Sequence, residues 1–559
     1  MLFSCLVDAD YLDTERFMDG KKFDARGRYP TLAALAEPFW SFIAVLEQKA
    51  KSTSVNIIRK EIRMACEQAA IKDRGLFSLS VPTGGGKTLS AMAFAFRHIQ
   101  SHSEHGFRRI IYVIPYTSII EQTARILGGI FGRENVVEHH SNLSLEKETA
   151  RSRMASENWD APIVVTTNVQ FFESFYSAKP SQCRKLHNIT NSIVILDEAQ
   201  LLPAKWLTPC VEVINHLVQK YGVTLLLATA TQPALPGLLP ATKIISPDLD
   251  LYGSLRRTKI YPPPSMEHPE NWDDIAGELK RHSQVLCIVN TRRDCYDLYK
   301  AMPEGTIHLS ASMCGRHRSA TIRVIKLRLR KRLPIRVIST QLVEAGVDID
   351  FPVVYRALAG LDSIVQAAGR CDREGRSTAA GNLGQVHIFI PPKPAPPGLL
   401  RKGEDKTREL LAIADIDLQH PDTFGRYFEL FYGALNDSGK EWLYELLIRD
   451  ANPDLAFQFR TAGKQFQIVE EQGQAVFVRY GKSEKWLKQL SLIGPKRENL
   501  RALQRYSVNL SKFNFERAHA AGLVENIWQD EFWCWTPEYD RCIGVNIFGS
   551  GWSANDLIV

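Results

Sequence analysis

The sequence lacks long apolar runs, paired cysteines and a strong charge of either sign. No uninterrupted hydrophobic stretch approaches the ~20 residues that cross a bilayer, and residues 1–30 mix acidic with basic side chains, unlike a signal peptide. The 10 cysteines form no Cys-x-x-Cys pair, so neither a zinc knuckle nor a disulfide framework is indicated. The net charge of +7 permits a polyanionic partner but does not require one. We therefore expect a cytoplasmic protein with no membrane partner, and composition alone indicates no activity.

Between residues 71 and 391, short runs rich in Val, Ile and Leu alternate with segments of helical periodicity. Unbroken apolar runs are typical of strands that are buried on both faces of a parallel sheet. Their alternation with helices predicts an α/β fold of doubly wound parallel sheets. The runs are LFSLSV (76–81), RIIYVIP (109–115), APIVVTT (161–167), SIVILDE (192–198), VTLLLAT (223–229), QVLCIVN (284–290), GTIHLSA (305–311), IRVISTQ (335–341), FPVVYRA (351–357) and GQVHIFIP (384–391).

The alternation breaks between residues 247 and 274, where prolines and polar residues replace it, so we expect two α/β domains in tandem. A small α+β domain is expected at the C-terminus, with a β-hairpin in FQIVEEQGQAVFVRYG (466–481). The predicted division is an N-terminal helical remnant (1–28), a helical connector (29–70), the first α/β domain (71–258), the second (259–391), a Pro-rich linker with helices (392–455) and the C-terminal domain (456–559).

The segment SVPTGGGKTLSAMAFAF joins a predicted strand to a predicted helix and has the composition of a phosphate-binding loop. Glycines allow a tight turn whose N–H groups meet phosphate oxygens, a lysine reaches the β and γ phosphates, and a threonine hydroxyl suits Mg²⁺. Val81 stands where the strict pattern has glycine, but the flanking strand and helix argue against a chance glycine turn. The predicted ATP-binding residues here are Pro82, Thr83, Gly84, Gly85, Gly86, Lys87 and Thr88.

A second acidic site follows the strand of SIVILDEAQLLP, at the carboxyl edge of the sheet where α/β proteins bind ligands. Asp197 is placed to hold Mg²⁺ together with Thr88, and Glu198 to orient and deprotonate the attacking water. The alternative is a pair of solvated acids at a strand end. The phosphate-loop lysine on the same predicted sheet favours a catalytic pair.

Two arginines in VQAAGRCDREGR, Arg370 and Arg373, are three residues apart and are expected on one face of a helix. Arginines brought by the second domain to a γ-phosphate held by the first would act as arginine fingers, typically worth about 10³- to 10⁵-fold in rate. The alternative is an ordinary basic surface helix.

Taken in order, VPTGGGKT, LDEAQ, TAT, STQLVEAGVDID and QAAGRCDREGR resemble the motifs of the superfamily 2 helicases over residues 70–390. The resemblance implies two RecA-like domains and assigns roles to further residues. It adds Asp348 and Gln366 to the ATP site and gives Thr229 and Thr231 the coupling of ATP hydrolysis to nucleic-acid binding. The implied strand-gripping residues are Pro115, Thr117, Thr167 and Asn168 in the first domain, and Asn290, Thr291 and Thr340 in the second.

A narrower resemblance rests on LLP after DEAQ, HHSN at His139, IPYTSIIEQT, the Pro-rich linker and EYDRCIGV. Together they look like the CRISPR-associated helicase-nuclease of type I interference. That family implies ATP and Mg²⁺ as cofactors, single-stranded DNA as substrate, 3′ to 5′ movement, and recruitment by an RNA-guided CRISPR surveillance complex. The chain is expected to act as a monomer.

The same resemblance interprets the N-terminal segment MLFSCLVDADYLDTERF as the last helix of an HD nuclease domain. By position Asp10 matches that domain's last metal ligand, and Asp8 matches less well. The sequence contains no His-Asp dipeptide, and a lone aspartate does not hold a two-metal centre. We therefore expect a motor without a competent nuclease, with a transition metal only where a complete HD site exists. The alternative for both aspartates is a solvated acidic helix face.

Other interpretations stay open at this point. An RNA helicase of the same superfamily, or a nucleotide-gated binding adaptor without movement, would share these motifs. His98, His102 and His105 have a zinc-compatible spacing, although a solvated helix end is favoured. The bases of residues 322–334 border a nucleic-acid path or, more simply, cover a solvated helix face. FWCWTPEYD (532–540) forms either a base-stacking surface or, preferably, the core of the C-terminal domain.

Overall fold

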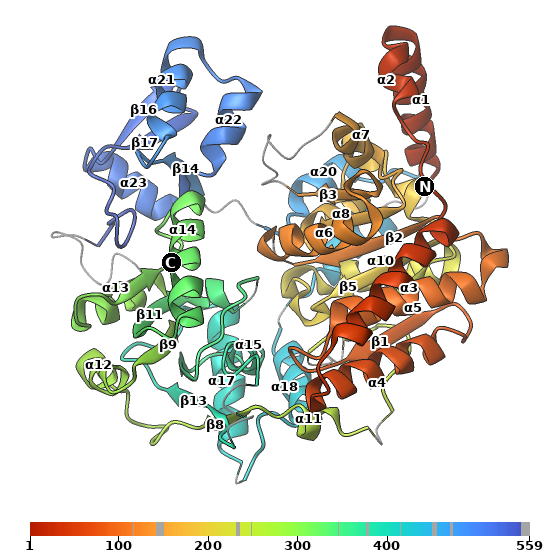
Figure 1. Cartoon of the computed structure of the whole chain (residues 1–559). Helices are drawn as coiled ribbons and strands as arrows, with labels where there is room; N and C mark the ends of the chain where they lie inside the picture. The colour runs from red at the N-terminus through yellow and green to blue at the C-terminus, as the bar shows by residue number, and fades with distance from the viewer. Residues whose placement is uncertain are drawn as a thin grey trace. The chain divides into compact units, whose positions relative to one another are not determined.

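The computed structural model describes the chain as two compact units (Figure 1). The first unit contains the described residues up to Arg256 and those from His420 to Val469, and the second contains Arg257–Gln419 and the described residues after 472. Among the described residues, no helix is both long and apolar enough to cross a membrane. The structure describes all residues except 116, 141–149, 231–234, 247–248, 345, 376–377, 379–380, 414, 436, 450–454, 470–472 and 549–559.

The first unit is built on a seven-stranded sheet in the order β3-β4-β2-β5-β6-β1-β7, with every neighbouring pair parallel. The five apolar runs predicted there are confirmed as strands, and their side chains are buried on both faces. The short edge strands β3 and β7 were not predicted. The strands are β1 (Leu76–Ser80), β2 (Arg109–Ile114), β3 (Val136–His139), β4 (Ile163–Thr167), β5 (Ser192–Asp197), β6 (Thr224–Thr229) and β7 (Thr242–Lys243).

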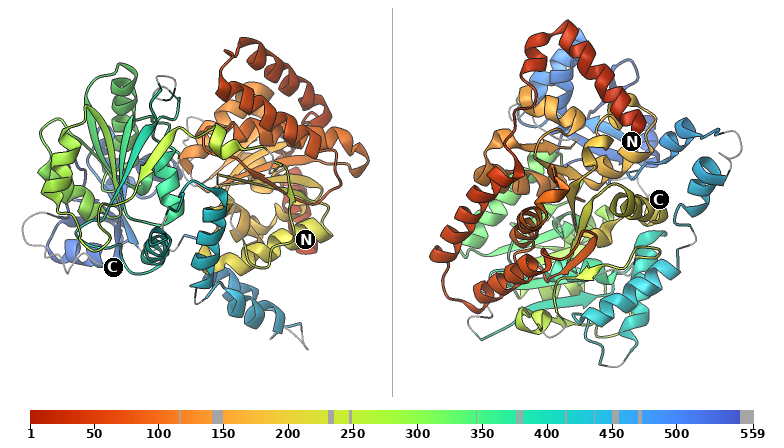
Figure 2. Two further views of the ribbon diagram at one scale, coloured as in Figure 1. Left: turned by 90° about the horizontal axis from the view of Figure 1, so that it is seen from below. Right: turned by 90° about the vertical axis from the view of Figure 1, so that its right-hand side faces the viewer.

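Helices cover both faces of this sheet (Figure 2). On one face α3 to α6 share a single apolar core with β1 and β2, which includes Phe39, Phe94 and Tyr112. On the other face α8 and α10 contact β4 and β6. The helices are α1 (Leu2–Met18), α2 (Gly20–Asp24), α3 (Leu32–Lys49), α4 (Ser54–Ala69), α5 (Lys87–Ser101), α6 (Thr117–Phe131), α7 (Ala150–Asn158), α8 (Asn168–Tyr176), α9 (Pro180–Cys183), α10 (Leu207–Lys220) and α11 (Leu251–Ser254).

The second unit has a six-stranded parallel sheet in the order β10-β11-β9-β12-β13-β8. The five predicted runs are again strands, so the structure confirms two doubly wound parallel sheets in tandem. The strands are β8 (Thr258–Tyr261), β9 (Gln284–Val289), β10 (Ile307–Leu309), β11 (Ile335–Thr340), β12 (Val353–Ala357) and β13 (Gly384–Phe389). The helices are α12 (Trp272–Lys280), α13 (Arg292–Ala301), α14 (Gly315–Arg330), α15 (Leu361–Ala368) and α17 (Leu399–Leu411).

The C-terminal part of the second unit is a small α+β fold with the strand order β15-β14-β17-β16. Its aromatic segment lies in the core, because Trp535 and Tyr539 are buried, as the preferred interpretation of FWCWTPEYD requires. The elements are β14 (Gly473–Phe477), α21 (Ser483–Ile493), α22 (Arg497–Gln504), β15 (Ser507–Ser511), α23 (Lys512–Ala520), β16 (Val524–Trp528) and β17 (Phe532–Trp535).

The β-hairpin expected in 466–481 is wrong, since among the described residues of this segment only β14 forms a strand, and it pairs with β15 and β17. The preceding residues return to the first unit instead. There the buried ring of Phe466 contacts Tyr176 and Trp206, and the indole N–H of Trp206 donates to the Gln467 carbonyl at 2.8 Å. This aromatic packing outweighs the local β pattern. The returning helices are α18 (Pro421–Gly433), α19 (Lys440–Leu443), a π-helix (Tyr444–Arg449) and α20 (Phe459–Gln465).

Candidate nucleotide-binding site

The phosphate loop of the first unit follows β1 and ends where α5 begins at Lys87. Gly84 and Gly86 have φ values of +83° and +84°, which glycine adopts without strain. Val81, the departure from the strict pattern, is fully buried and its N–H donates to the Thr229 carbonyl at 3.0 Å. A Cβ added to Gly85 would lie 2.3 Å from the Val81 side chain. The valine thus fixes the loop to the sheet, and its bulk makes glycine necessary at position 85.

Arg59 of α4 holds the loop from outside and was not predicted from the sequence. Its Nε and Nη2 donate to the Gly84 carbonyl at 2.9 Å and 2.8 Å, and its side chain lies against Gly86. In the sequence Arg59 is one basic residue of an amphipathic helix, so no local pattern marks it. Because Arg59 contacts a carbonyl, it occupies no N–H group of the loop, although the Gly85 N–H itself donates to the Pro82 carbonyl at 3.1 Å.

The acidic site at the end of β5 meets the phosphate loop. Lys87 Nζ lies 2.6 Å from Glu198 Oε1, and Gln200 Nε2 donates to the other oxygen of Glu198 at 2.6 Å. Glu198 has a left-handed φ of 52°, which turns its side chain out of the strand direction. The lysine and glutamate predicted to act together are therefore in direct contact, although 111 positions separate them.

Asp197 lies deeper, and the Tyr112 hydroxyl donates to its Oδ2 at 3.2 Å. Burial raises the pKa of Asp197 to about 6, while the charge of Lys87 lowers it and that of Glu198 raises it. Burial and Asp197 also raise the pKa of Tyr112, which therefore stays protonated as a donor. The carboxylates of Asp197 and Glu198 and the hydroxyl of Thr88 at the start of α5 provide the oxygen ligands that Mg²⁺ prefers. The residues present thus fit a nucleotide bound with magnesium.

The predicted coupling residues follow β6. Thr229 is buried, and its carbonyl accepts the Val81 N–H, which joins the end of β6 directly to the phosphate loop. Thr231 lies outside the described residues. A displacement of the end of β6 would therefore also displace the phosphate loop, and the reverse.

The strand-gripping residues predicted in the first unit follow β2 and β4 at the same sheet edge. Pro115 is half-buried, and Thr117 begins α6, although its side chain lies outside the described part of the chain. Thr167 and Asn168 are both buried, and the Thr167 hydroxyl accepts the Gln170 N–H at 2.9 Å as the cap of α8. In this structure Thr167 shapes the start of a helix.

In the second unit, Asn290 and Thr291 follow β9. Asn290 donates to the Leu358 carbonyl at 2.8 Å and accepts from the guanidinium of Arg356 at 2.7 Å, while Thr291 caps α13. Both line a cavity of about 560 Å³, whereas Thr340 is the half-buried last residue of β11. The charged and aromatic residues that line this cavity, which we name the strap cavity, are Arg292, Arg293, Asp294, Lys393, Arg401, Phe513 and Phe548.

The expectation that Arg370 and Arg373 share a helix face is wrong, because α15 ends at Ala368. Arg370 is buried, and its Nε donates to the Val343 carbonyl at 2.8 Å. The chain then turns at Asp372, where φ is 45°, and Arg373 Nε lies 3.4 Å from Asp348 Oδ1. Gln366 lies half-buried on α15. Their predicted roles toward ATP remain predictions, since each contact described here lies within the second unit.

The two N-terminal aspartates differ from each other, since Asp10 lies on the solvated helix face given as the alternative for both, and Asp8 does not. Asp10 is exposed, and among the described residues no group of metal-ligand geometry includes it. Asp8 is buried, accepts from Arg184 Nε at 2.8 Å and from Asn158 at 3.1 Å, and lies 3.5 Å from the ring of His187. A solvated acidic face is therefore wrong for Asp8, whose buried ion pair anchors α1 to the first unit.

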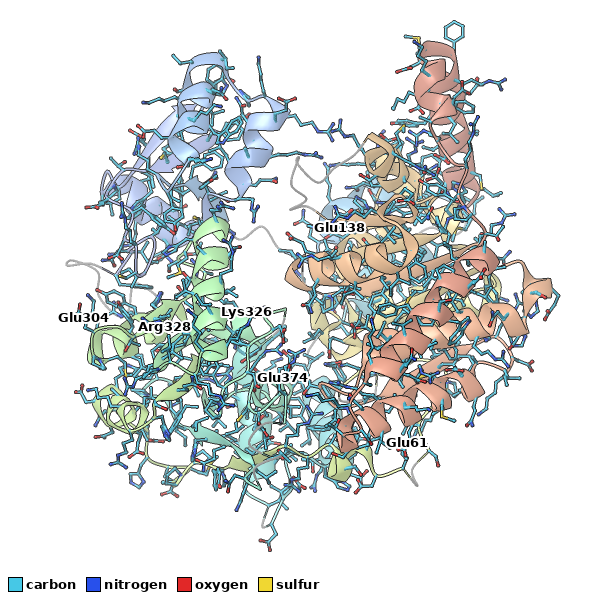
Figure 3. All side chains as sticks on the ribbon, viewed as in Figure 1. Glu61, Glu138, Glu304, Lys326, Arg328 and Glu374 are labelled. Atoms are coloured by element: carbon cyan, nitrogen blue, oxygen red, sulfur yellow. The ribbon has the colours of Figure 1, made fainter. Side chains whose placement is uncertain are left out.

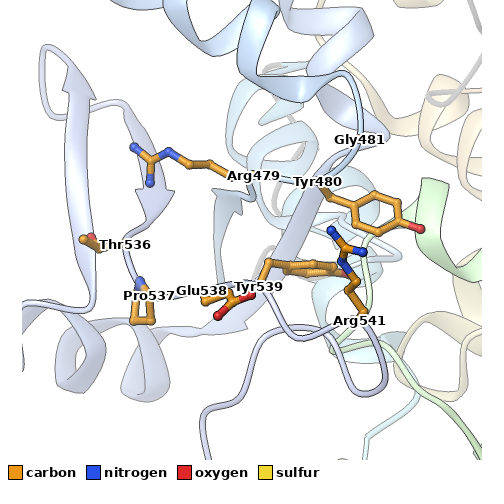
Figure 4. Close-up of a pocket in the computed structure, with 8 residues that line it drawn as sticks. All are labelled: Arg479, Tyr480, Gly481, Thr536, Pro537, Glu538, Tyr539 and Arg541. Carbon is orange, nitrogen blue, oxygen red and sulfur yellow. The ribbon is translucent and has the colours of Figure 1, made fainter.

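Two further surfaces of the second unit were singled out in the sequence. The helix α14 buries Ile325 and Leu329 and exposes Arg323 and Arg328, as expected of a solvated basic face. Arg328 is labelled on this helix in Figure 3. Beside the aromatic core, a pocket of about 530 Å³ is lined by charged and aromatic side chains (Figure 4). Its lining residues include Arg479, Tyr480, Glu538, Tyr539 and Arg541.

Two known families match residues in the regions of the two parallel sheets. A DEAD/DEAH box helicase family matches residues 60–236, and the family of the C-terminal part of CRISPR-associated nuclease/helicase Cas3 matches residues 281–376. Cas3 of Haloferax volcanii is 27% identical over 435 residues, which cover 56% of this chain and 46% of that protein. Cas3 of Methanothermobacter thermautotrophicus is 25% identical over 413 residues, with coverages of 68% and 48%. The chain spans about half the length of the curated relatives it matches.

Solved structures with a similar fold include T. fusca Cas3 bound to ATP, with a TM-score of 0.60 at 15% identity, covering 86% of this chain and 70% of that one. A CRISPR RNA-guided surveillance complex before nicking contains a chain with a TM-score of 0.52 at 16% identity, with coverages of 85% and 68%. At these identities the likeness shows the fold alone, which is the predicted pair of RecA-like domains. The family matches and the curated relatives confirm the resemblance to CRISPR-associated nuclease/helicase proteins.

Proposed function

We propose that this chain, which resembles CRISPR-associated nuclease/helicase Cas3 in sequence and fold, is an ATP-dependent single-stranded DNA translocase of CRISPR antiviral interference. The observation that carries the proposal is the contact of 2.6 Å between Lys87 and Glu198 at the carboxyl edge of a buried parallel sheet. A phosphate-binding lysine and a carboxylate that can accept a proton from water are two requirements of nucleotide hydrolysis. Their meeting on a tandem RecA-like fold favours a working motor over an inactive adaptor.

The residues of the first unit would have separate roles in binding and hydrolysing ATP. Bound ATP supplies the phosphoanhydride to be cleaved, and Mg²⁺ neutralises charge on its phosphates. Asp197 and Thr88 would hold the cation, and Gly84 to Gly86 would bind phosphate oxygens through their N–H groups. If Lys87 turned from Glu198 to phosphate, Oε1 of Glu198 could orient water instead. Gln200 would keep hold of the second carboxylate oxygen during that exchange.

Asp348, Gln366, Arg370 and Arg373 are proposed to complete the ATP site from the second unit. Arg373 is half-buried, and its guanidinium contacts the exposed carboxylate of Asp348. It could therefore exchange that partner for phosphate at little loss. Arg370 is held by backbone carbonyls, so we assign it the role of fixing the turn in addition to any contact with the nucleotide.

The strap cavity supports a nucleic-acid partner. Its lining carries four basic side chains and one acidic side chain, an excess that favours a polyanion. Phe513 and Phe548 add aromatic surface on which bases of a single strand can stack. Because Asn290 and Thr291 line the same cavity, we propose that the strand gripped by the motor passes here. Movement 3′ to 5′ is part of this proposal, by resemblance.

We propose further that residues 1–559 act as a monomeric motor without nuclease activity, in the cytoplasm. Asp10 is exposed and belongs to no three-ligand group among the described residues, which is compatible with this proposal. A fold neighbour found in an RNA-guided surveillance complex supports such a complex as the partner that delivers R-loop DNA.

The test is ATP turnover by the purified chain without nucleic acid, with single-stranded DNA, and with RNA of the same sequence. Strong stimulation by DNA and weak stimulation by RNA are expected, with Lys87→Ala as the blank. Lys488→Ala, at a side chain 71% exposed, is the matched control. Equal or greater stimulation by RNA would favour RNA remodelling, which the shared motifs allow. Turnover without displacement of a paired strand would favour the nucleotide-gated adaptor.

A further inference from the structure

The C-terminal end of α5 is a packed histidine cluster, so the solvated helix end expected there is wrong. His98 is fully buried, with Nδ1 2.8 Å from the Ala70 carbonyl and Nε2 2.9 Å from the Thr224 hydroxyl. Burial lowers the pKa of His98 to about 4, so it stays neutral at ordinary pH. Because both of its ring nitrogens are engaged, His98 is not a candidate ligand. It positions the next ring, His102, whose centroid lies 4.5 Å away.

Beyond His98, the side chains of His102, Glu104 and His105 converge. One ligand atom from each lies within 4.8 Å of the others, and this is the one such group of three found among the described residues. His102 Nδ1 and His105 Nε2 each lie 3.6 Å from Glu104 Oε1. The 3₁₀ turn Ser103–His105, closed by Gly106 at φ +62°, brings the three residues to one side of the chain.

We propose that His102, Glu104 and His105 bind a divalent ion of the late first-row transition metals, Zn²⁺ foremost. Two imidazoles and a carboxylate are ligands that zinc accepts, and three protein ligands leave a fourth position for water. The imidazole pair also disfavours Mg²⁺ and Ca²⁺, which prefer sets made only of oxygen.

The hydrogen bond of His102 Nε2, the ring nitrogen that points away from Glu104, also supports a metal site. Nε2 lies 2.9 Å from the Lys72 carbonyl, which can only accept, so Nε2 carries a proton, and Nδ1, which lies toward Glu104, is the nitrogen that can bind a metal. Metal-binding histidines are typically oriented in this way by a carbonyl on their other nitrogen. His105 is steadied by stacking on His102 with centroids 5.7 Å apart, and by the edge of Phe107.

The site lies far from the nucleotide. The helix α5 carries Lys87 at its first residue and Ser101 at its last, so at 1.5 Å per residue the two ends are roughly 20 Å apart. The ion would therefore not take part in hydrolysis. It would tie the end of the phosphate-loop helix to the connection between α4 and β1, through His102 and Lys72. An ion that binds only the folded chain stabilises it by mass action, so Zn²⁺ should raise the melting temperature.

The test is titration of the chain, free of any polyhistidine tag, with Zn²⁺ and then Co²⁺. We expect saturable binding of one ion, a Co²⁺ spectrum with the intense visible bands of four-coordinate geometry, and a higher melting temperature with Zn²⁺. His105→Ala and Glu104→Gln should each weaken binding at least about tenfold. Both side chains are partly exposed, so both variants should fold.

The matched control is His216→Ala. His216 and Glu212 form an exposed pair 3.8 Å apart on α10, with the same residue types but no third ligand in that group among the described residues. Its loss should leave binding unchanged. Absence of saturable binding in the parent chain, or equal weakening by His216→Ala, would overturn the proposal. His105→Ala should keep its DNA-stimulated ATP turnover. Loss of metal binding in this variant would then not be due to failure of the proposed motor.

Discussion

The two sheets carry motifs at the same edge but use their charged residues differently. In the first unit, Lys87 contacts Glu198 and Tyr112 contacts Asp197, so residues from separate strands and loops face one another. In the second unit, Arg356 is fully buried, and its Nε lies 2.8 Å from Oε1 of Glu344, a residue of STQLVEAGVDID. In the first site, the half-buried Lys87 and Glu198 can change partners, whereas Tyr112 and Asp197 are buried. The second is held by side chains whose partners are fixed by burial.

This difference shows that residues of a motif can contact one another inside the protein and need not contact a ligand. Ser363 donates to Glu344 at 2.6 Å and accepts from Arg356 at 2.9 Å, which completes a buried network. Asn290 joins the same network through Arg356. Residues that resemble gripping or sensing positions thus shape the sheet edge, whereas Asp348 is exposed and Arg373 is half-buried.

The largest expected effect is on the chemistry of the first unit. Lys87→Ala and Glu198→Gln should each lower DNA-stimulated ATP turnover by about 10²- to 10³-fold or more, since each removes a group that acts on the reacting phosphate or water. Circular dichroism should show an unchanged fold. Turnover within a few-fold of the parent in either variant would mean that this contact is not the hydrolytic centre.

The next effect is on the stability of the second unit. Arg356→Ala leaves the carboxylate of Glu344 buried without its partner, which should lower the free energy of unfolding by about 3–5 kcal/mol. Denaturant titration followed by a probe in the second unit measures it. Arg323→Ala, on the exposed face of α14, should change stability by no more than about 0.5 kcal/mol. Equal effects of the two changes would remove the contrast between fixed and exchangeable partners.

A smaller effect is expected from the arginine that holds the phosphate loop. Arg59→Ala removes two hydrogen bonds to the Gly84 carbonyl, so KM for ATP should rise about tenfold while kcat changes less. Lys60→Ala, whose side chain is 57% exposed on the same helix, is the control. A loss confined to kcat would show that Arg59 acts in the chemical step and not in loop placement.

The smallest effect concerns pH. The folded pKa of Asp197 is raised from 3.8 to about 6, so its protonation favours the folded state. That contribution is fully present below pH 3.8 and is lost as pH rises through about 6. Without nucleotide or Mg²⁺, Asp197→Asn should therefore remove part of the fall in melting temperature between pH 4 and 7. Parallel melting curves for variant and parent across this range would contradict the raised pKa.

Much of the fold could be predicted because its strands are continuous apolar runs. All the predicted runs became parallel strands, whereas β3, β7 and β8, of 4, 2 and 4 residues, were not predicted. The failures concern segments with two possible partners. The pattern of 466–481 predicts a hairpin, but Phe466 packs with Trp206, and the spacing of Arg370 and Arg373 predicts a helix that in fact ends before both.

The sequence by itself determined the phosphate loop, the acidic strand end and the tandem sheets, because these depend on residues adjacent in the chain. Only the tertiary structure decided that Arg59 holds Gly84, that Asp8 pairs with Arg184, and that His102 faces Glu104 with its far nitrogen on Lys72. Such contacts depend on where the chain returns to after many residues. Burial then sets their strength, because a charged or polar group removed from water must find a partner.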